Sequence, residues 1–392
     1  QISILMNSNL IKSLEESCHN ILIKNLERTT ETVYILYDTL SPLASIVSDA
    51  YMSAFWTTEW IIFRRFIDPP APLYRWWLIN PKNPHQMEEK RIMSEFNQWE
   101  NLERWLNHQE EEKAVTEEVI SEEVESIKEE LLSLPAGSIV VLVQSSNFRL
   151  STFRIRLELF HRWVHVVEHN HLSYIPESQF ETFIRSHEYR TPYYISEFER
   201  LSDITQSASW LRIYSSTGEI LQVGETETMR GNTGDYRWVI NKWGTFPLGE
   251  VFTEAKDLES VNGVVMVNTY PNTDFSIEQV KSFPLHIENG RVLANAEFPE
   301  GFQKIYQMVL EHEWEVMVRE IGFGLNTAIS TEHPLSDVNF HERKHGIHLS
   351  LGKKHGIYGK KLPKTMLQRY HIDLFVDLDR VETPEHGIIF QQ

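Results

Sequence analysis

The chain has 392 residues, of which 41% are hydrophobic, and this length predicts two packed domains instead of one core. Its 56 acidic and 37 basic residues give a formal net charge of −19, which argues against binding to nucleic acid or to an anionic membrane surface. The single cysteine, Cys18, excludes an intrachain disulfide and a zinc site built from several cysteines.

The sequence contains no apolar run of about 20 residues, which is the length that a membrane-spanning helix needs. Its first ten residues, QISILMNSNL, lack the basic start and the long apolar core of a signal peptide. We therefore expect a cytoplasmic protein without a membrane span.

The first part of the chain predicts helices around a buried sheet. Residues 8–64 begin with a Ser/Asn cap and repeat apolar residues at helical spacing, and residues 87–133 predict a charged, solvated helix. The run SIVVLVQ (138–144) is continuously apolar and β-branched, which is typical of a buried parallel strand. We expect an α/β fold, with a three-layer N-terminal domain around a parallel sheet.

Two features of this part suggest binding sites. Four tryptophans lie between residues 56 and 77, where an aromatic ligand groove is possible, although core packing or a subunit interface is the simpler interpretation. Residues 151–170 predict a helix that carries His161, His165 and His169 at four-residue spacing. Two such histidines can share a metal ion, but the glutamate of an HExxH motif is missing, and a polar helix stripe is the favoured interpretation.

The second half changes character near Tyr236. Strands are predicted near residues 208–225, and the Asn-Gly pair in HIENGRVL predicts a β-hairpin. The run FQKIYQMVLEHEWEVMVREIGFGL predicts a helix followed by a Gly-rich turn. We therefore divide the chain into an N-terminal domain, residues 1–237, and a C-terminal α+β domain, residues 238–392.

The C-terminal domain is rich in side chains that bind metals. His371 and Asp373 are two residues apart, so on a strand both side chains point to one face. His348 and His355 are seven apart and flank LSLG. With Glu250 and Glu320, these residues offer imidazole and carboxylate ligands for a divalent ion. The alternative is an exposed histidine-rich loop at residues 341–361.

The order of four segments resembles a metalloenzyme superfamily. GTFPLGEVFTEAKDLESVNGVVMV, EIGFGLNTAI, HGIHLSLG and YHIDLFVD are similar, in this order, to segments of the aminopeptidase T superfamily, which also contains the 2,5-dihydroxypyridine 5,6-dioxygenases. The resemblance covers roughly residues 236–378 and implies a metal-dependent enzyme that acts on a small molecule or a short peptide. It also implies a homodimer.

The aminopeptidase branch implies two metal ions, either zinc, cobalt or manganese. Its ligand positions fall on Glu250, Glu320, His348, His371 and Asp373, and a further tyrosine position holds His355 in this chain. Its catalytic glutamate has only an approximate counterpart, Glu342, which lies one residue out of step. Both departures weaken the peptidase interpretation.

The dioxygenase branch implies one Fe(II) ion, and it is the interpretation that we favour from the sequence. Glu320, His355, His371 and Asp373 would surround the ion and leave open positions for O₂ and a chelating substrate. In this interpretation His348 or Glu342 moves a proton, and Lys353 or Lys354 holds a substrate carboxylate. A third alternative is an inactive scaffold of the same fold that binds a partner through its aromatic N-terminal region.

Overall fold

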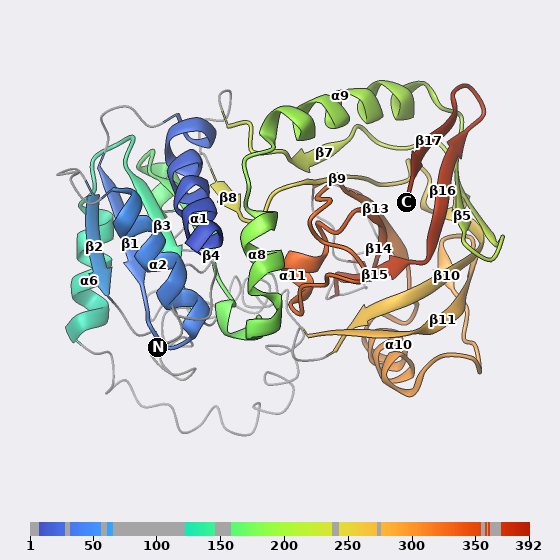
Figure 1. Cartoon of the computed structure of the whole chain (residues 1–392). Helices are drawn as coiled ribbons and strands as arrows, with labels where there is room; N and C mark the ends of the chain where they lie inside the picture. Colours follow the sequence, from blue (N-terminus) through green and yellow to red (C-terminus); the bar gives the residue numbers. More distant parts are fainter. Residues whose placement is uncertain are drawn as a thin grey trace, which may run out of the picture. The chain divides into compact units, whose positions relative to one another are not determined.

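The computed structural model describes residues 8–27, 32–55, 61–65, 122–145, 158–236, 243–272, 276–353, 357–358, 360 and 370–392. These residues form two compact units, and each unit is discontinuous in sequence (Figure 1). Unit 1 contains the described residues up to Thr191 and the segment Gly234–Leu248, whereas unit 2 contains Pro192–Thr233 and Gly249–Gln392. The predicted division at residues 237 and 238 falls inside the segment that returns to unit 1, and it stays a prediction.

A five-stranded, wholly parallel sheet forms the centre of unit 1, with the strand order β2-β1-β3-β4-β8. All five residues of β3 are buried, which confirms the buried parallel strand predicted at residues 138–144. The strands of this sheet are β1 (Val33–Tyr37), β2 (Ile61–Arg65), β3 (Ile139–Val143), β4 (His165–His169) and β8 (Trp243–Thr245).

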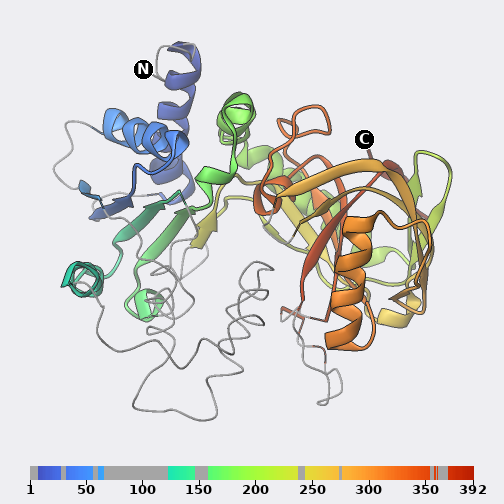
Figure 2. The same cartoon turned by 90° about the horizontal axis from the view of Figure 1, so that it is seen from below.

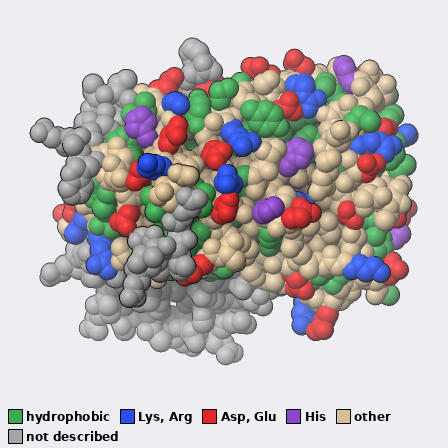
Figure 3. All heavy atoms as spheres, in the orientation of Figure 1, with side chains coloured by type: hydrophobic (Ala, Val, Ile, Leu, Met, Phe, Trp, Pro, Cys, Tyr) green, Lys and Arg blue, Asp and Glu red, His purple; other side chains and the backbone are tan. Residues whose placement is uncertain are grey.

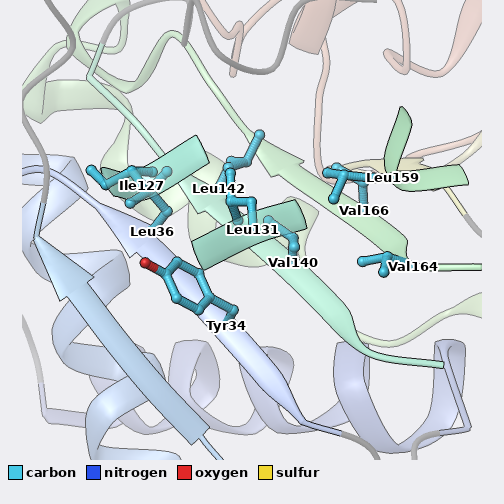
Figure 4. Packing of buried hydrophobic residues seen from close by; sticks show 9 residues of the cluster. All are labelled: Tyr34, Leu36, Ile127, Leu131, Val140, Leu142, Leu159, Val164 and Val166. Carbon is cyan, nitrogen blue, oxygen red and sulfur yellow. The ribbon is translucent and has the colours of Figure 1, made fainter. Parts of the chain in front are cut away.

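Helices cover both faces of this sheet, and this confirms the predicted three-layer α/β arrangement. Helices α1 and α2 lie on one side and α6 lies on the other (Figure 2). Ile127 and Leu131 of α6 pack against Tyr34, Leu36 and Val140 of the sheet (Figure 4). The helical elements of unit 1 are α1 (Ser8–Asn20), the π-helix η2 (Ile21–Asn25), α2 (Pro42–Ala54), α6 (Glu122–Leu132), the 3₁₀ turns η5 (Leu172–Tyr174) and η6 (Glu177–Gln179), and α8 (Phe180–Ser186).

Two of the helix predictions for this part are wrong. Residues 8–64 are not continuously helical, because VYILY is strand β1, which pairs in parallel with strands on both sides. His165 and His169 lie on β4, not on a helix, because the β-branched run between them is buried in the sheet. The predicted histidine stripe therefore does not exist as a helix face. The four tryptophans lie outside the described residues, as does most of the charged segment 87–133.

Unit 2 is built around a curled antiparallel sheet of twelve strands. Ten follow the order β17-β16-β5-β6-β10-β15-β14-β13-β9-β7, while β11 pairs with β10 and β12 pairs with β11. The strands are β5 (Leu211–Ser215), β6 (Ile220–Val223), β7 (Arg230–Asn232), β9 (Glu250–Thr253), β10 (Asn262–Pro271), β11 (Ile277–Glu288), β12 (Arg291–Val292), β13 (Val318–Gly324), β14 (Gly346–Leu351), β15 (Ile372–Val376), β16 (Leu378–Thr383) and β17 (Gly387–Gln391).

The predicted hairpin and the predicted helix are both present in unit 2. Asn289 and Gly290 join β11 to β12 with positive φ angles of 50° and 74°, as the predicted Asn-Gly turn requires. Helix α10 (Glu300–Glu313) buries Phe302 against Phe283 of β11, with ring centres 5.1 Å apart. The remaining helices are α9 (Thr191–Ser207), the turn η7 (Leu258–Ser260) and α11 (Val338–His341).

Charged side chains do not gather into one acidic patch on the described part of the face shown in Figure 3. Acidic and basic side chains are interspersed over the described part of that face (Figure 3). Among the helices of the described ranges, none combines the length and the apolar character needed to cross a bilayer.

Candidate metal centre

Four neighbouring strands of unit 2, in the order β9-β13-β14-β15, carry the candidate ligands on one face. Glu320 of β13 lies opposite Ser350 of β14, and Ser350 lies opposite Asp373 of β15. His348 precedes Ser350 by two residues, so its side chain points to the same face. Ligands that are up to 123 positions apart in the sequence, Glu250 and Asp373, are thereby brought to one part of the sheet.

The first ligand group surrounds the imidazole of His348. Its Nε2 atom lies 3.3 Å from Glu250 Oε1 and 3.4 Å from Glu320 Oε1. Gly322 lies opposite His348 on β13, and a Cβ atom at Gly322 would come within 2.0 Å of His348 Nε2. The predicted Gly-rich turn is therefore wrong: EIGFG is strand β13, and its glycine makes room for the imidazole.

The second ligand group contains the predicted His-x-Asp pair. His371 directly precedes β15, and its Nε2 atom lies 3.4 Å from Asp373 Oδ1. The hydroxyl of Ser350 lies 3.1 Å from His371 Nε2 and donates a hydrogen bond to Asp373 Oδ1. The i, i+2 spacing therefore places both side chains together, as predicted.

Glu320 belongs to both groups. One ligand atom each from Glu250, Glu320 and His348 lies within 4.8 Å of the others, and the same holds for Glu320, His371 and Asp373. Four of the five residues are buried, and the His371 side chain is 27% exposed. The carboxylate and imidazole donors are of the types that zinc, manganese and iron accept, so the residues present fit one or two divalent ions.

The electrostatics of the centre are dominated by its carboxylates. Burial opposes the charged form of His348, but the hydrogen bonds to Glu250 and Glu320 and the charge of Asp373 outweigh it and raise the His348 pKa to about 10. Burial opposes ionisation of Asp373 as well, yet the neighbouring His371 holds the Asp373 pKa well below its usual range. The carboxylates of the site therefore stabilise a positive charge placed between them, such as a protonated imidazole or a cation.

A guanidinium group lies next to the first ligand group. Arg343 is buried, and its Nη1 atom lies 3.5 Å from Glu250 Oε2 and donates to the carbonyl oxygen of Asn339 at 2.8 Å. It also forms an ion pair with Glu342, the predicted base, whose side chain is 17% exposed. Through Arg343 the structure connects Glu342 to Glu250.

Sequence reasoning missed Ser350, Arg343 and Gly322. The signal for Ser350 was present, because it alternates with His348 along a strand and therefore shares its face. Arg343 follows the predicted base directly, but only the fold brings it to Glu250. Gly322 is revealed only by its register with His348.

Other predicted residues lie elsewhere or outside the described residues. His355 and Lys354 are outside them. Lys353 is fully buried, and its ammonium lies 2.9 Å from Glu315 and 2.7 Å from the carbonyl oxygen of Glu313. These contacts satisfy the ammonium within unit 2, so they do not support the predicted contact with a substrate carboxylate.

The alternative of an exposed histidine loop is wrong for the part of residues 341–361 that the structure describes. His348 and His341 are both buried. The His341 ring packs edge-on against Phe375, with ring centres 4.6 Å apart, and its Nδ1 atom accepts a hydrogen bond from the backbone N–H of Leu335 at 3.4 Å. His348 therefore belongs to the first ligand group, and His341 is part of the core beside it.

Comparisons with known proteins agree with this fold. No model of a protein family matches the chain, and no curated protein matches it in sequence. The structure of a 2,5-dihydroxypyridine dioxygenase from Pseudomonas putida KT2440 matches with a TM-score of 0.57 and 13% sequence identity, over 99% of this chain and 97% of that chain. The wild-type AmpT structure from Thermus thermophilus matches with a TM-score of 0.54 and 12% identity, over 94% of each chain. The chain therefore shares its fold with both proteins.

Proposed function

We propose that the chain is a metal-dependent hydrolase that would hold two divalent cations on two ligand groups, both of which include Glu320, and that removes amino-terminal residues from short peptides. The observation that carries this proposal is the sharing of Glu320 by two groups of three ligands. One carboxylate common to two adjacent groups is what a pair of closely spaced cations requires. The interpretation with a single iron is second to it, because one ion held by Glu320, His371 and Asp373 leaves Glu250 and His348 of the other group without a role.

The chemistry assigned to the cations is that of two-metal hydrolases, in which bound ions polarise a carbonyl group and lower the pKa of a bound water. Glu250 and His348 would hold one cation, and His371 and Asp373 would hold the other. Zinc, manganese and cobalt are the candidates. The substrate class follows from the shared fold with AmpT and is part of the proposal.

The residues around the ligands have separate roles in this proposal. Ser350 orients His371 and Asp373 through its two hydrogen bonds. Arg343 fixes the second oxygen of Glu250 and holds Glu342 nearby. Glu342 is assigned as the proton acceptor, because its carboxylate is close to the ligands and is partly exposed to solvent.

The test compares Glu320→Gln with Glu288→Gln, which changes an exposed carboxylate on β11 of the same unit. We expect two metal equivalents per wild-type chain by mass spectrometry and release of amino-terminal residues from a peptide panel. Glu320→Gln should lose both ions and at least about 100-fold in kcat/KM, because both groups lose a ligand. Glu288→Gln should retain both properties. Two bound ions with no hydrolysis of any peptide would refute the peptidase assignment.

A single-iron oxygenase is the second candidate, and one observation favours it. The group Glu320, His371 and Asp373 is complete without Glu250 and His348, and a three-ligand group leaves positions open for O₂ and a chelating substrate. The Glu250→Gln variant separates the candidates. An iron oxygenase should keep about one iron and its oxygen uptake with hydroxylated pyridines, whereas the two-cation hydrolase should lose one ion and its activity. Absence of bound metal in the wild-type chain would instead favour the inactive scaffold.

A further inference from the structure

Unit 1 contains a pair of buried imidazoles that has no part in the proposed hydrolase. His169 ends strand β4, and His187 directly follows helix α8. Their exposed fractions are 1% and 6%, and their ring centres are 5.4 Å apart. Two histidines seldom meet in a protein core unless their ring nitrogens have partners.

Each ring has one nitrogen in a fixed hydrogen bond. His187 Nδ1 donates to the carbonyl oxygen of Phe183 at 2.8 Å, so its Nε2 atom carries a lone pair. His169 Nε2 lies 2.9 Å from the hydroxyl of Tyr51. A hydrogen bond from one ring nitrogen to a backbone carbonyl or a polar side chain is the arrangement that orients metal-binding histidines.

The other nitrogen of each ring has no hydrogen-bond partner among the described residues. His169 Nδ1 and His187 Nε2 are both buried without a hydrogen bond to any described residue. An unpaired buried nitrogen destabilises a fold, so two of them in adjacent rings point to an occupant that satisfies both. Burial, reinforced for His169 by the charge of His187, lowers the pKa of His169 well below its usual range. Burial also lowers the pKa of His187 to about 4, so both rings are neutral at pH 7.

A small enclosed cavity lies beside His187. It has room for about one water molecule, at about 10 Å³, and Ser17, Asn20, Asn25 and Phe246 are among its lining residues. Asn20 directly precedes the π-helix η2 and Asn25 is its last residue, and π-helical turns are frequent at functional sites. The Phe246 ring, which lines this cavity, also packs against His169, with ring centres 5.8 Å apart.

We propose that His169 Nδ1 and His187 Nε2 bind one transition-metal ion of the zinc class in unit 1, with water from the cavity completing its coordination. Neutral imidazole is a preferred ligand of zinc, copper and nickel. With zinc–nitrogen distances of about 2.0–2.1 Å and tetrahedral angles, two imidazoles on one ion have ring centres about 5 Å apart. The observed separation of 5.4 Å agrees with this value. The ion would connect the end of strand β4 to the end of helix α8.

The test counts zinc in the full-length chain by mass spectrometry after equilibration with zinc and removal of excess. We compare the wild type, the double variant His169→Gln/His187→Gln and the control His171→Gln, which changes another buried histidine two residues from His169. The double variant should lose about one zinc per chain, and the control should lose none. Metal bound in unit 2 is common to all three proteins, so the difference does not depend on the proposed hydrolase.

A second variant tests the role assigned to Tyr51. Tyr51→Phe removes the hydroxyl that fixes His169, and the zinc affinity of this site should fall about 10–100-fold, as for other partners of metal-binding histidines. Equal zinc content in the wild type and a folded double variant would overturn the proposal and leave a buried water as the occupant. If the double variant does not fold, ¹⁵N-histidine spectra of the wild type decide. Two unprotonated ring nitrogens should shift on zinc addition, and unchanged spectra would overturn the proposal.

Discussion

Gly322 and Ser350 hold the candidate metal centre together although neither was predicted as a ligand. Gly322 provides the space that the His348 ring occupies, and Ser350 joins His371 to Asp373. A ligand set is useful only when neighbouring residues fix its geometry, so changes at these two positions test the centre without removing a ligand.

The variant Gly322→Ala should displace His348. Its new methyl group would meet the imidazole at 2.0 Å, and such overpacking costs about 1–3 kcal/mol of stability. We expect loss of the ion held by His348, measured as one metal equivalent per chain. The control is Gly218→Ala, where an added Cβ meets no atom within 4 Å but a φ of 100° strains the backbone, so it measures the effect of destabilisation away from the centre. Full metal content in Gly322→Ala would show that His348 is not a ligand.

The variant Ser350→Ala should weaken the second ligand group. His371 and Asp373 lose their common partner, and metal affinity should fall about 10–100-fold in equilibrium titrations. Ser330→Ala, which removes an exposed hydroxyl of unit 2, serves as the control. An unchanged affinity in Ser350→Ala would mean that the serine is replaced by the ion as a partner and has no positioning role.

At the scale of elements, short-range patterns predicted some segments well and others poorly. The strand at 138–144, the Asn-Gly hairpin and the spacing of His371 and Asp373 depend on local chemistry, and the structure contains all three. The helix predicted for residues 151–170 is wrong at residues 165–169, where burial in a parallel sheet decides the conformation of β4, although residues 158–161 are helical. The helix predicted across β1 is wrong for the same reason, because β1 is buried and pairs with parallel strands on both sides.

The hairpin between β11 and β12 offers a test at this scale. Gly290 has a φ of 74°, and a Cβ atom there would approach the carbonyl oxygen of Leu258 to 2.1 Å. Gly290→Ala should therefore lower the free energy of unfolding by about 1–2 kcal/mol from the left-handed backbone alone, with an additional loss from the clash. Asn289→Gly should be nearly neutral, since glycine accepts the same conformation. Urea midpoints of the two variants provide the comparison.

At the scale of the whole molecule, the sequence predicted which residues could bind a metal but not how they are grouped. The motifs indicated Glu250, Glu320, His348, His371 and Asp373, and the register of four strands brings them together. Sharing of Glu320 depends on distances between strands that are far apart in sequence, so no spacing rule could predict it. The discontinuous units were not predicted, because the change in character near Tyr236 was interpreted as a single domain boundary and not as the return of Gly234–Leu248 to unit 1.

The pH dependence of the metal-free chain should report the environment of His348. Its pKa is about 10 in the folded protein and about 6.5 when unfolded, so the folded state binds the extra proton between these values. The stabilisation is complete below pH 6.5 and is lost as the pH rises through about 10. We expect wild type and His348→Gln, both treated with chelator, to differ most near pH 6 in thermal unfolding and to converge only as the pH rises above about 10. A difference that grows with pH would contradict this assignment.

Because each unit is made of separated segments of the chain, the choice of fragments for expression is restricted. A fragment that begins at Gly249 keeps every described candidate ligand but lacks β5, β6 and β7, three strands of the sheet on which those ligands lie. A fragment that ends at Thr191 lacks β8, an edge strand of the parallel sheet. Neither half can therefore be produced by a single cut without exposing unpaired strand edges that promote aggregation. A permuted gene that joins the separated segments of one unit is the route to an isolated metal-binding half.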